Sequence, residues 1–253
     1  MLHGRHALVT GAARGIGAAI ARTLAAEGAT LTLLGRNAAT LQQLAAQLPG
    51  QHGIALADVA DPYQVNAAFA RARAERGALH ILVNNAGQVE SAPFGKTTLE
   101  LWQRMLAVNL TGSFLCSQAA LPQMLAGGGG RIVNIASTAA QKGYAYVSAY
   151  VAAKHGVLGL TRALALEVAR KGITVNAVCP GYTETDILRE SVANLVAKTG
   201  RSEAEAMAEF AGGNPQQRIV QPEDVAQAVR WLCSDGASAV TGQAISVSGG
   251  EVM

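Results

Sequence analysis

The chain has 253 residues, half of them hydrophobic, and a formal net charge of +3, which is enough length for a large core in one α/β domain or two smaller ones. Its basic residues are scattered, and no window approaches the roughly 18 unbroken apolar residues of a membrane span, so we expect neither nucleic-acid binding nor membrane insertion. Three widely spaced cysteines, and five histidines without a metal-ligand pattern, predict a cytoplasmic protein with no metal site.

Short apolar runs rich in β-branched residues predict the strands. They are the segments 6–10, 30–34, 53–57, 80–85, 131–137, 174–180 and 243–250. Between them, the spacing of apolar residues predicts helices at 15–27, 37–48, 61–76, 99–126 and 149–171. Because strands alternate with helices and no long linker or repeat interrupts them, we expect a single Rossmann-type α/β domain over residues 1–253. It would have about seven parallel strands covered by helices on both faces.

The first predicted strand runs into "TGAARGIG", residues 10–17, a glycine-rich loop that opens a helix. Glycine permits a tight turn and a close backbone approach, and the helix N-terminus offers free N–H groups and a positive dipole end to a phosphate. The spacing is G-x-x-x-G-x-G, not the commonest dinucleotide fingerprint, and a plain strand-to-helix turn is the alternative. At the head of alternating strands and helices, the loop favours dinucleotide binding. The candidate residues are Gly11, Arg14, Gly15, Ile16 and Gly17.

The second predicted strand ends at Gly35 and Arg36, where the adenine ribose of a dinucleotide is expected. An acidic residue here would bind the ribose hydroxyls and select NAD, whereas a glycine followed by a guanidinium suits a 2′-phosphate. Arg14 is placed to supply a second cation to the same phosphate. We therefore expect NADP(H) as the favoured cofactor and NAD(H) as the alternative; two solvated surface arginines would explain the pattern without a ligand.

In "YVAAK", residues 150–154, Tyr150 and Lys154 are four residues apart and share one face of a helix. A cation about 4 Å from a phenolate is worth about 4 kcal/mol at an effective dielectric of 20, enough to lower a phenol pKa from about 10 by about two or three units. Tyr150 would then donate or accept a proton near neutral pH. The alternative is a tyrosine that fills the core beside a lysine that reaches water.

Two features lie outside the regular alternation. The segment 182–215 contains two short helices and no strand until near residue 244, and so long an insertion at the carboxyl end of a strand predicts a substrate lid. The helices 99–126 and 149–171 are apolar or small on most sides, so they need a second partner besides the sheet. Another copy of the chain is the simplest partner, which predicts a homodimer or homotetramer.

The ordered set of motifs resembles the short-chain dehydrogenase/reductase family, essentially from residue 5 to 250. The matching elements are "TGAARGIG" (10–17), "DV" (58–59), "NNAG" (84–87), Asn109, Ser137, "YVAAK" (150–154) and "PGYTET" (180–185). A Tyr-x-x-x-Lys pair alone carries little weight, but the whole set in this order is specific. The resemblance implies an NAD(P)-dependent oxidoreductase of CH–OH groups, in which hydride moves between a nicotinamide and a carbonyl carbon.

The resemblance also implies roles for individual residues. Tyr150 would exchange the proton, Ser137 would orient the substrate oxygen, Lys154 would hold the nicotinamide ribose, and Asn109 would hold a water that links Lys154 to solvent. A buried residue at a helix kink is the alternative for Asn109. The implied cofactor contacts are Asp58 and Val59 at the adenine, Asn85, Ala86 and Gly87 near the adenosine ribose, and Pro180, Gly181, Thr183 and Thr185 at the nicotinamide amide and pyrophosphate, together with Tyr150 and Lys154.

The substrate is expected to be a small carbonyl or alcohol compound. The chain is most similar to the 3-oxoacyl-[acyl-carrier-protein] reductase and 3-hydroxyacyl-thioester dehydrogenase branch, which implies a 3-oxoacyl thioester reductase. The apolar side chains of the expected lid favour an acyl or ring-bearing substrate over a bare sugar. They are Ile187, Leu188, Val192, Leu195, Val196, Met207 and Phe210, with Tyr144, Tyr146 and Tyr182 flanking the pocket.

Three points stay open at this stage. Arg104 and Arg131 are candidates to receive an acidic carrier or a coenzyme A phosphate, and simple solvation is the alternative. The rival activity is an NAD-dependent secondary-alcohol, sugar or steroid dehydrogenase. A non-enzymatic relative is disfavoured, because the four implied catalytic residues are all intact.

Overall fold

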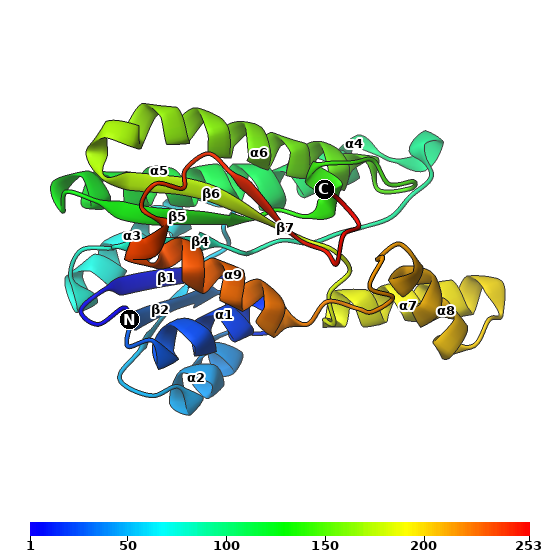
Figure 1. Ribbon diagram of the computed structural model, residues 1–253, viewed down its shortest axis with the longest axis horizontal. Coiled ribbons are helices and arrows are strands. Elements are labelled where there is room, and N and C mark those ends of the chain that lie inside the picture. Colours follow the sequence, from blue (N-terminus) through cyan, green and yellow to red (C-terminus); the bar gives the residue numbers. More distant parts are fainter.

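The computed structural model describes residues 1–253 and has at its centre a seven-stranded parallel sheet of order β3-β2-β1-β4-β5-β6-β7 (Figure 1). The strands are β1 (His6–Thr10), β2 (Thr30–Gly35), β3 (Gly53–Leu56), β4 (Ile81–Asn84), β5 (Gly130–Ile135), β6 (Ile173–Pro180) and β7 (Ala244–Val247). Each coincides with a predicted run to within two residues at its start. The predicted Rossmann-type sheet is confirmed.

Helices cover both faces of the sheet. They are α1 (Gly15–Ala26), α2 (Ala38–Gln47), α3 (Pro62–Arg76), α4 (Leu99–Leu106), α5 (Gly112–Ala126), α6 (Ser148–Val168), α7 (Asp186–Thr199), α8 (Glu203–Gly212) and α9 (Pro222–Cys233). One large core cluster joins the sheet to α1, α2 and α9, and the other joins it to α3, α5 and α6. Strand β1 serves both, because successive side chains of a strand point to opposite faces: Ala7 and Val9 enter the first cluster and Leu8 the second.

The predicted helix 99–126 is wrong in one respect, because it is two α-helices joined by a π-helical turn, η2 (Ala107–Thr111). Asn109 sits in that turn, buried, and its side-chain amide donates to the carbonyl of Met105 at 2.9 Å. A π turn inserts one extra residue per turn and commonly marks a functional site. The apolar spacing of the sequence runs through the turn without a break, so it gives no sign of the insertion.

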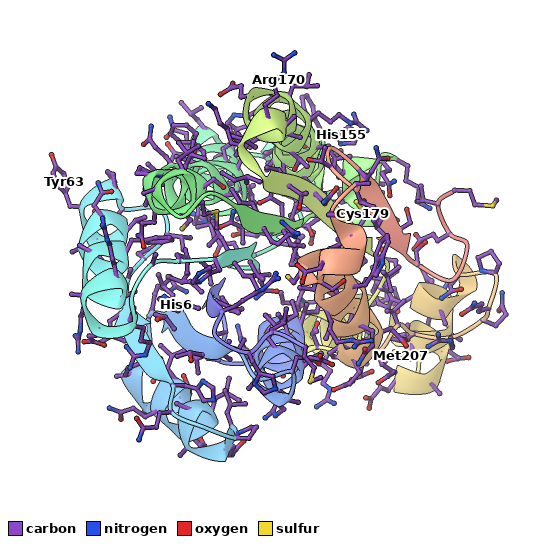
Figure 2. The ribbon with its side chains drawn as sticks, turned by 60° about the vertical axis from the view of Figure 1, so that its left-hand side comes forward. His6, Tyr63, His155, Arg170, Cys179 and Met207 are labelled. Carbon is purple, nitrogen blue, oxygen red and sulfur yellow. The ribbon has the colours of Figure 1, made fainter.

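The segment between β6 and α9 holds the two predicted short helices, α7 and α8, which stand out beside the main body (Figure 1). Buried Leu188 and Val192 of α7 pack on Ala206 of α8. The other expected apolar side chains also pack against this small cluster: Leu195, Val196, Met207 and Phe210. Most of this apolar face therefore holds α7 and α8 together, while Ile187 stays exposed. Figure 2 labels Met207 on α8 and Cys179 on β6.

Three further features bear on the sequence-based expectations. Every helix of the chain is too short or too polar to cross a bilayer. No group of three or more His, Cys, Asp or Glu side chains is placed to hold a metal ion. The cysteines Cys116, Cys179 and Cys233 are all free and buried.

Candidate active site

The strand order brings distant segments of the chain to one edge of the sheet. Strands β1 and β4 are neighbours, and the chain winds outward in opposite directions from this pair, through β2 and β3 on one side and β5 to β7 on the other. In a parallel sheet this switch point opens a crevice at the carboxyl ends of the strands, where ligands bind. Most of the expected site residues lie in the loops or first helical turns after these strands. Pro180 is the last residue of β6, and Asn109, Tyr150 and Lys154 lie further along the chain, in η2 and α6.

The glycine loop between β1 and α1 is tightly built. Gly11 and Gly15 adopt φ values of +61° and +53°, which side-chain-bearing residues rarely adopt. A Cβ on Gly17 would lie 2.3 Å from the carbonyl oxygen of Gly11, so only glycine lets α1 start so close to the loop. The amide of Asn85, after β4, donates to the carbonyls of Thr10 and Gly11 at 3.0 and 3.1 Å and fixes the loop.

The N-terminus of α1 is open to an anion. Its N-cap residue, Arg14, makes no side-chain cap, and the first turn contains no acidic residue, so the positive end of the helix dipole is not neutralised. The Arg14 guanidinium pairs at 3.0 Å with Asp186, in the first turn of α7. The methyl group of Thr185 lies 3.1 Å from where a Cβ on Gly15 would be, so the loop after β6 lies against the glycine loop.

The adenine side of the crevice carries Arg36 and Asp58. The Arg36 side chain is 75 % exposed and lies 3.7 Å from the Asp58 carboxylate. Asp58 also accepts a hydrogen bond from the N–H of Ala60 at 3.0 Å, while Val59 is buried. A Cβ on Gly35 would meet only the Leu41 side chain at an ordinary 3.6 Å, so packing does not require a glycine there.

The loop 180–185 after β6 closes the other side. The Thr183 hydroxyl donates to the carbonyl of Gly181 at 2.9 Å, and the Thr183 main chain bridges to Val220. The Thr185 hydroxyl donates to the carbonyl of Thr183 at 3.2 Å and caps α7 at Leu188. The hydroxyl expected at the pyrophosphate is thus also the N-cap of the helix that follows.

Tyr150 and Lys154 lie on α6 and share one side of the crevice with Ser137, at the end of β5. Lys154 as a whole is 4 % exposed. Its ammonium donates to the carbonyl of Ile135 at 2.8 Å and lies 5.6 Å from the centroid of the Tyr150 ring. The neighbouring Ser137 side chain favours the charged form of the Tyr150 phenol, which lowers its pKa. The Ser137 hydroxyl accepts from the N–H of Ala139 at 3.1 Å, which orients it.

Burial dominates the electrostatics of this group. It raises the pKa of the Tyr150 phenol above its ordinary value, and the neighbouring Ser137 side chain opposes that shift. It lowers the pKa of the Lys154 ammonium to about 8. The prediction that Lys154 lowers the Tyr150 pKa is therefore wrong for the chain by itself, because the desolvation of the phenol outweighs a cation 5.6 Å from the centroid of its ring.

Asn109 reaches the same place from η2. Its Nδ2 donates to the carbonyl of Gln88 at 2.9 Å and its Oδ1 accepts from the N–H of Gln88 at 3.2 Å, so its side chain fixes the loop after β4. A Cβ on Gly87 would lie 2.8 Å from Asn109 Oδ1 and 3.6 Å from Lys154 Nζ. Gly87 is thus the small residue that fits between Asn109 and the lysine, and the alternative of a buried residue at a helix irregularity describes Asn109 well.

An aromatic wall stands beside Ser137. The Tyr144 and Tyr182 rings pack edge to face, with their centroids 6.2 Å apart. The Tyr182 ring packs in the same way on Phe210 of α8, with the centroids 4.9 Å apart. Tyr146 adopts a φ of +67°, strained for a tyrosine, and is exposed. Behind the wall lies the carboxylate of Glu251, which the sequence analysis does not single out, because nothing in the local sequence shows that the chain end folds back there.

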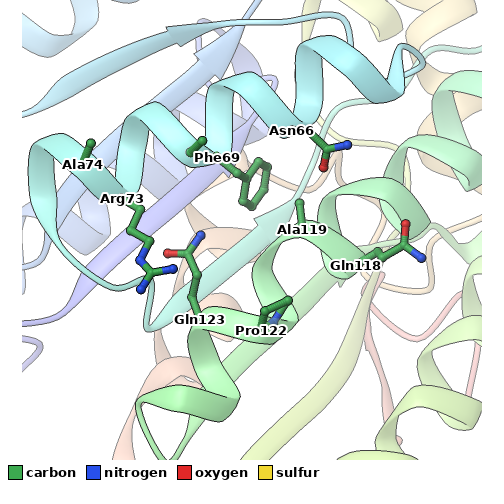
Figure 3. Close-up of a pocket in the computed structure, with 9 residues that line it drawn as sticks. Asn66, Phe69, Arg73, Ala74, Gln118, Ala119, Pro122 and Gln123 are labelled. Atoms are coloured by element: carbon green, nitrogen blue, oxygen red, sulfur yellow. The ribbon is translucent and has the colours of Figure 1, made fainter.

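The two arginines considered as carrier contacts are engaged elsewhere. Arg131 is buried at the start of β5, at the opposite edge of the sheet from the crevice, where burial lowers its pKa. Arg104 pairs with Glu90 at 2.6 Å. A groove of about 570 Å³ between α3 and α5 shares no residue with the site described above (Figure 3). Phe69 and Arg73 line it from α3, and Pro122 and Gln123 from α5.

Comparison with known proteins decides the family. A family model described as "Enoyl-(Acyl carrier protein) reductase" matches residues 11–251. The chain belongs to the short-chain dehydrogenase/reductase family. This short-chain dehydrogenase/reductase is an NAD(P)-dependent oxidoreductase of carbonyl and alcohol groups, as the sequence predicts.

Its similarity to individual relatives extends over nearly the whole chain. It is 44 % identical to a putative ketoacyl reductase of granaticin polyketide synthase from Streptomyces violaceoruber, over 96 % of this chain and 92 % of the relative. It is 43 % identical to cis-4-hydroxycyclohexanecarboxylate dehydrogenase from Sinomonas cyclohexanicum, over 97 % of this chain and 96 % of the relative. A crystal structure of an actinorhodin polyketide ketoreductase variant with NADPH superimposes with a TM-score of 0.92 at 39 % identity, covering 99 % of both chains.

Proposed function

We propose that this short-chain dehydrogenase/reductase reduces a ketone to a secondary alcohol with NADPH, the substrate being a 3-oxoacyl thioester or a related ring-bearing ketone. The observation that carries the proposal is the grouping of Tyr150, Ser137 and Lys154 at the switch-point crevice, with Ser137 next to the phenol and the ammonium 5.6 Å from the centroid of the ring. The ketoacyl reductases among its relatives, and the ketoreductase solved with NADPH, support the choice of reaction and cofactor.

The chain offers a cradle that fits a dinucleotide. The open N-terminus of α1 and the small residues Gly11 and Gly15 would hold the pyrophosphate, with help from the Thr185 hydroxyl. Asp58 and Val59 would hold the adenine, and Arg36 and Arg14, both exposed on this edge, would bind the 2′-phosphate. The remaining proposed contacts are Ile16, Gly17, Asn85, Ala86, Gly87, Pro180, Gly181, Thr183, Tyr150 and Lys154.

When bound, the cofactor supplies a hydride for the carbonyl carbon. Tyr150 donates its phenolic proton to the carbonyl oxygen, and Ser137 donates a hydrogen bond that holds this oxygen in place. Lys154 stabilises the phenolate that remains, because its positive charge lies beside the ring. In the reverse direction the phenolate accepts the proton of the alcohol.

The proton of Tyr150 must be replaced after each turnover. Lys154 is buried, so it needs a path to solvent. Asn109 Oδ1 and the Lys154 ammonium lie 2.8 and 3.6 Å from where a Cβ on Gly87 would be, and this closeness supports the proposed role of Asn109 in holding a water on that path. The side-chain amide of Asn109 already bonds to Gln88 and Met105, so it is less suited to holding this water than the rest of the residue.

The walls of the crevice favour an apolar or ring-bearing substrate. Tyr144, Tyr182 and Phe210 form an aromatic side wall, and α7 and α8 would form a substrate lid over about residues 182–215. Flat rings pack well against aromatic edges and faces. A bare sugar would leave these surfaces without a matching partner.

A second candidate is an NAD-dependent dehydrogenase of secondary alcohols, sugars or steroids. The cis-4-hydroxycyclohexanecarboxylate and cyclohexanol dehydrogenases among the relatives favour it. Against its NAD preference stand Arg36 at the end of β2 and the absence of an acidic residue at Gly35. Both candidates need the same proton-transfer group.

We also infer a homodimer or homotetramer in the cytoplasm. On α6, Leu166 is 82 % exposed, and Phe114 of α5 is partly exposed, which leaves apolar surface for a second copy. Three free buried cysteines suit a reducing compartment. Light scattering at micromolar concentration tests the assembly: a dimer or tetramer is expected, and a monomer would contradict it.

Absorbance of the reduced cofactor gives the test of the proposed function. The purified protein would be assayed with NADPH and with NADH on β-ketoacyl thioesters, cyclic ketones and small acyclic ketones, and in reverse on sugars and steroids. We expect the highest kcat/KM with NADPH and a thioester or ring-bearing ketone. A clear preference for NAD⁺ and an alcohol or sugar would establish the second candidate instead.

A further inference from the structure

Glu251 lies in the carboxyl-terminal segment that follows β7. The chain turns at Gly249 and Gly250, with φ values of +61° and +93°, and brings the Glu251 side chain into the body of the protein, where it is 3 % exposed. One carboxylate oxygen, Oε1, accepts a hydrogen bond from the Tyr144 hydroxyl and lies 3.0 Å from the Lys142 ammonium. A buried carboxylate needs such partners to remain charged, so these contacts hold each other in place.

The direction of the hydrogen bonds links Glu251 to Ser137. The hydroxyls of Thr138 and Tyr144 are 2.6 Å apart. Because Tyr144 gives its only hydroxyl proton to the carboxylate, Thr138 must donate to Tyr144. The chain of donors therefore runs from Thr138, the residue directly after Ser137, through Tyr144 to Glu251.

Glu251 also touches the connection to α7 and α8. A Cβ on Gly181 would lie 2.9 Å from Glu251 Oε2, and one on Gly213, directly after α8, would lie 3.7 Å from Oε1. Glycine at 181 thus makes room for the carboxylate beside the loop after β6. Tyr144, which the carboxylate fixes, in turn packs edge to face on Tyr182.

We propose that Glu251 is a positioning residue that sets the substrate-side wall: it fixes the Tyr144 ring, and through that ring it holds Tyr182 beside the lid and Thr138 beside Ser137. The proposal rests on ketone reduction at this site. Glu251 acts on how the substrate is held, not on the proton transfer by Tyr150. Glu251 should therefore affect selectivity for bulky ketones and leave cofactor binding unchanged.

The test compares Glu251→Ala, Tyr144→Phe and the double variant with the wild type, on one ring-bearing and one small acyclic ketone. Each single variant should raise KM for the ring-bearing ketone about tenfold, a larger factor than its effect on kcat or on the KM of the small ketone. The double variant should have about the same KM for the ring-bearing ketone as either single variant, because the two substitutions break the same chain of contacts. Glu251→Gln keeps an acceptor for Tyr144 and should restore most of the selectivity.

Glu27→Ala is the matched control, because Glu27 is also a carboxylate held by ion pairs, with Arg230 and the N-terminal ammonium, and lies far along the chain from the site. It should change thermal stability without changing either KM. Unchanged selectivity in Glu251→Ala, additive effects in the double variant, or the same KM change in Glu27→Ala would overturn the proposal. Calorimetric binding of the ring-bearing ketone to the NADP⁺ complex gives the same comparison without turnover. If the wild type binds but reduces no ketone, the proposed function fails while the inference is still tested.

Discussion

Lys154 holds its ammonium group inside the protein with a main-chain carbonyl, not a carboxylate, as its acceptor. Burial without an anionic partner disfavours the charged form, which is why its pKa is lowered to about 8. The same group lies beside the Tyr150 ring. The lysine is therefore protonated at neutral pH and close to losing its charge in mildly alkaline solution.

The pH dependence of ketone reduction follows from this pKa. Below about pH 8 Lys154 binds its proton and supports the Tyr150 phenolate; above that pH it becomes neutral and the support is lost. We expect kcat/KM for the ketone, at saturating NADPH, to be level up to about pH 8 and then to fall as pH rises. Steady-state rates between about pH 6 and 10 measure this. A level profile across the whole range would show that the lysine charge plays no part.

The choice between cofactors is tested at Arg36. Replacing Arg36 with Asp puts a negative charge where the 2′-phosphate is proposed to bind. The KM for NADPH should therefore rise by about tenfold or more, whereas the KM for NADH should rise far less. Arg71→Asp is a suitable control, because Arg71 is exposed on α3 and paired with Glu75. Equal effects of Arg36→Asp on both cofactors would remove Arg36 from this role.

For single residues, the sequence predicts which side chains belong to the site but not how burial changes their pKa values. Ser137, Tyr150 and Lys154 lie near one another in the structure, and a serine after a strand and a Tyr-x-x-x-Lys pair on a helix are local patterns that the sequence displays. The raised pKa of Tyr150 depends on burial by segments far along the chain, so the pair alone predicts the wrong direction. Glu251 is 107 positions from its partner Tyr144, a distance that no local pattern spans.

At the scale of elements, a buried polar ladder links the strands to the helices behind the site. The Asn84 amide of β4 donates to Asn134 of β5 at 2.8 Å, and Asn134 donates to Thr161 of α6 at 2.8 Å. Each group is buried, so each needs its partner. The strands and helices themselves are predictable from their apolar spacing, whereas this ladder and the π turn at η2 are not, because both are fixed by contacts between elements.

Breaking the ladder should be costly. Asn134→Ala removes one hydrogen bond from Asn84, which keeps Ser113 and Ser117, and one from Thr161, which keeps Val157. The free energy of unfolding should therefore fall by about 2 kcal/mol. Urea denaturation measures this loss. Asn66→Ala, on the exposed side of α3, should change the same quantity by less than about 0.5 kcal/mol. Equal losses in the two variants would show that the ladder adds no specific stability.

At the scale of the whole molecule, the parallel sheet brings the segments of the site together. Segments that follow β1, β2, β3, β4, β5 and β6 all meet at one edge, although the chain separates the first from the last by about 170 residues. Alternating strands and helices predict this edge from the sequence. The way α7 and α8 pack on each other, and the return of the chain end to Tyr144, depend on tertiary contacts that spacing does not encode.

The central claim is that this edge presents Tyr150 as the proton donor of a carbonyl reductase. The most direct measurement is the kcat of Tyr150→Phe with NADPH and the best ketone, together with its NADPH affinity. Because the ring stays and only the hydroxyl is removed, we expect kcat to fall by roughly 10² to 10⁴-fold with cofactor affinity nearly unchanged. A turnover within about threefold of the wild type would contradict the account.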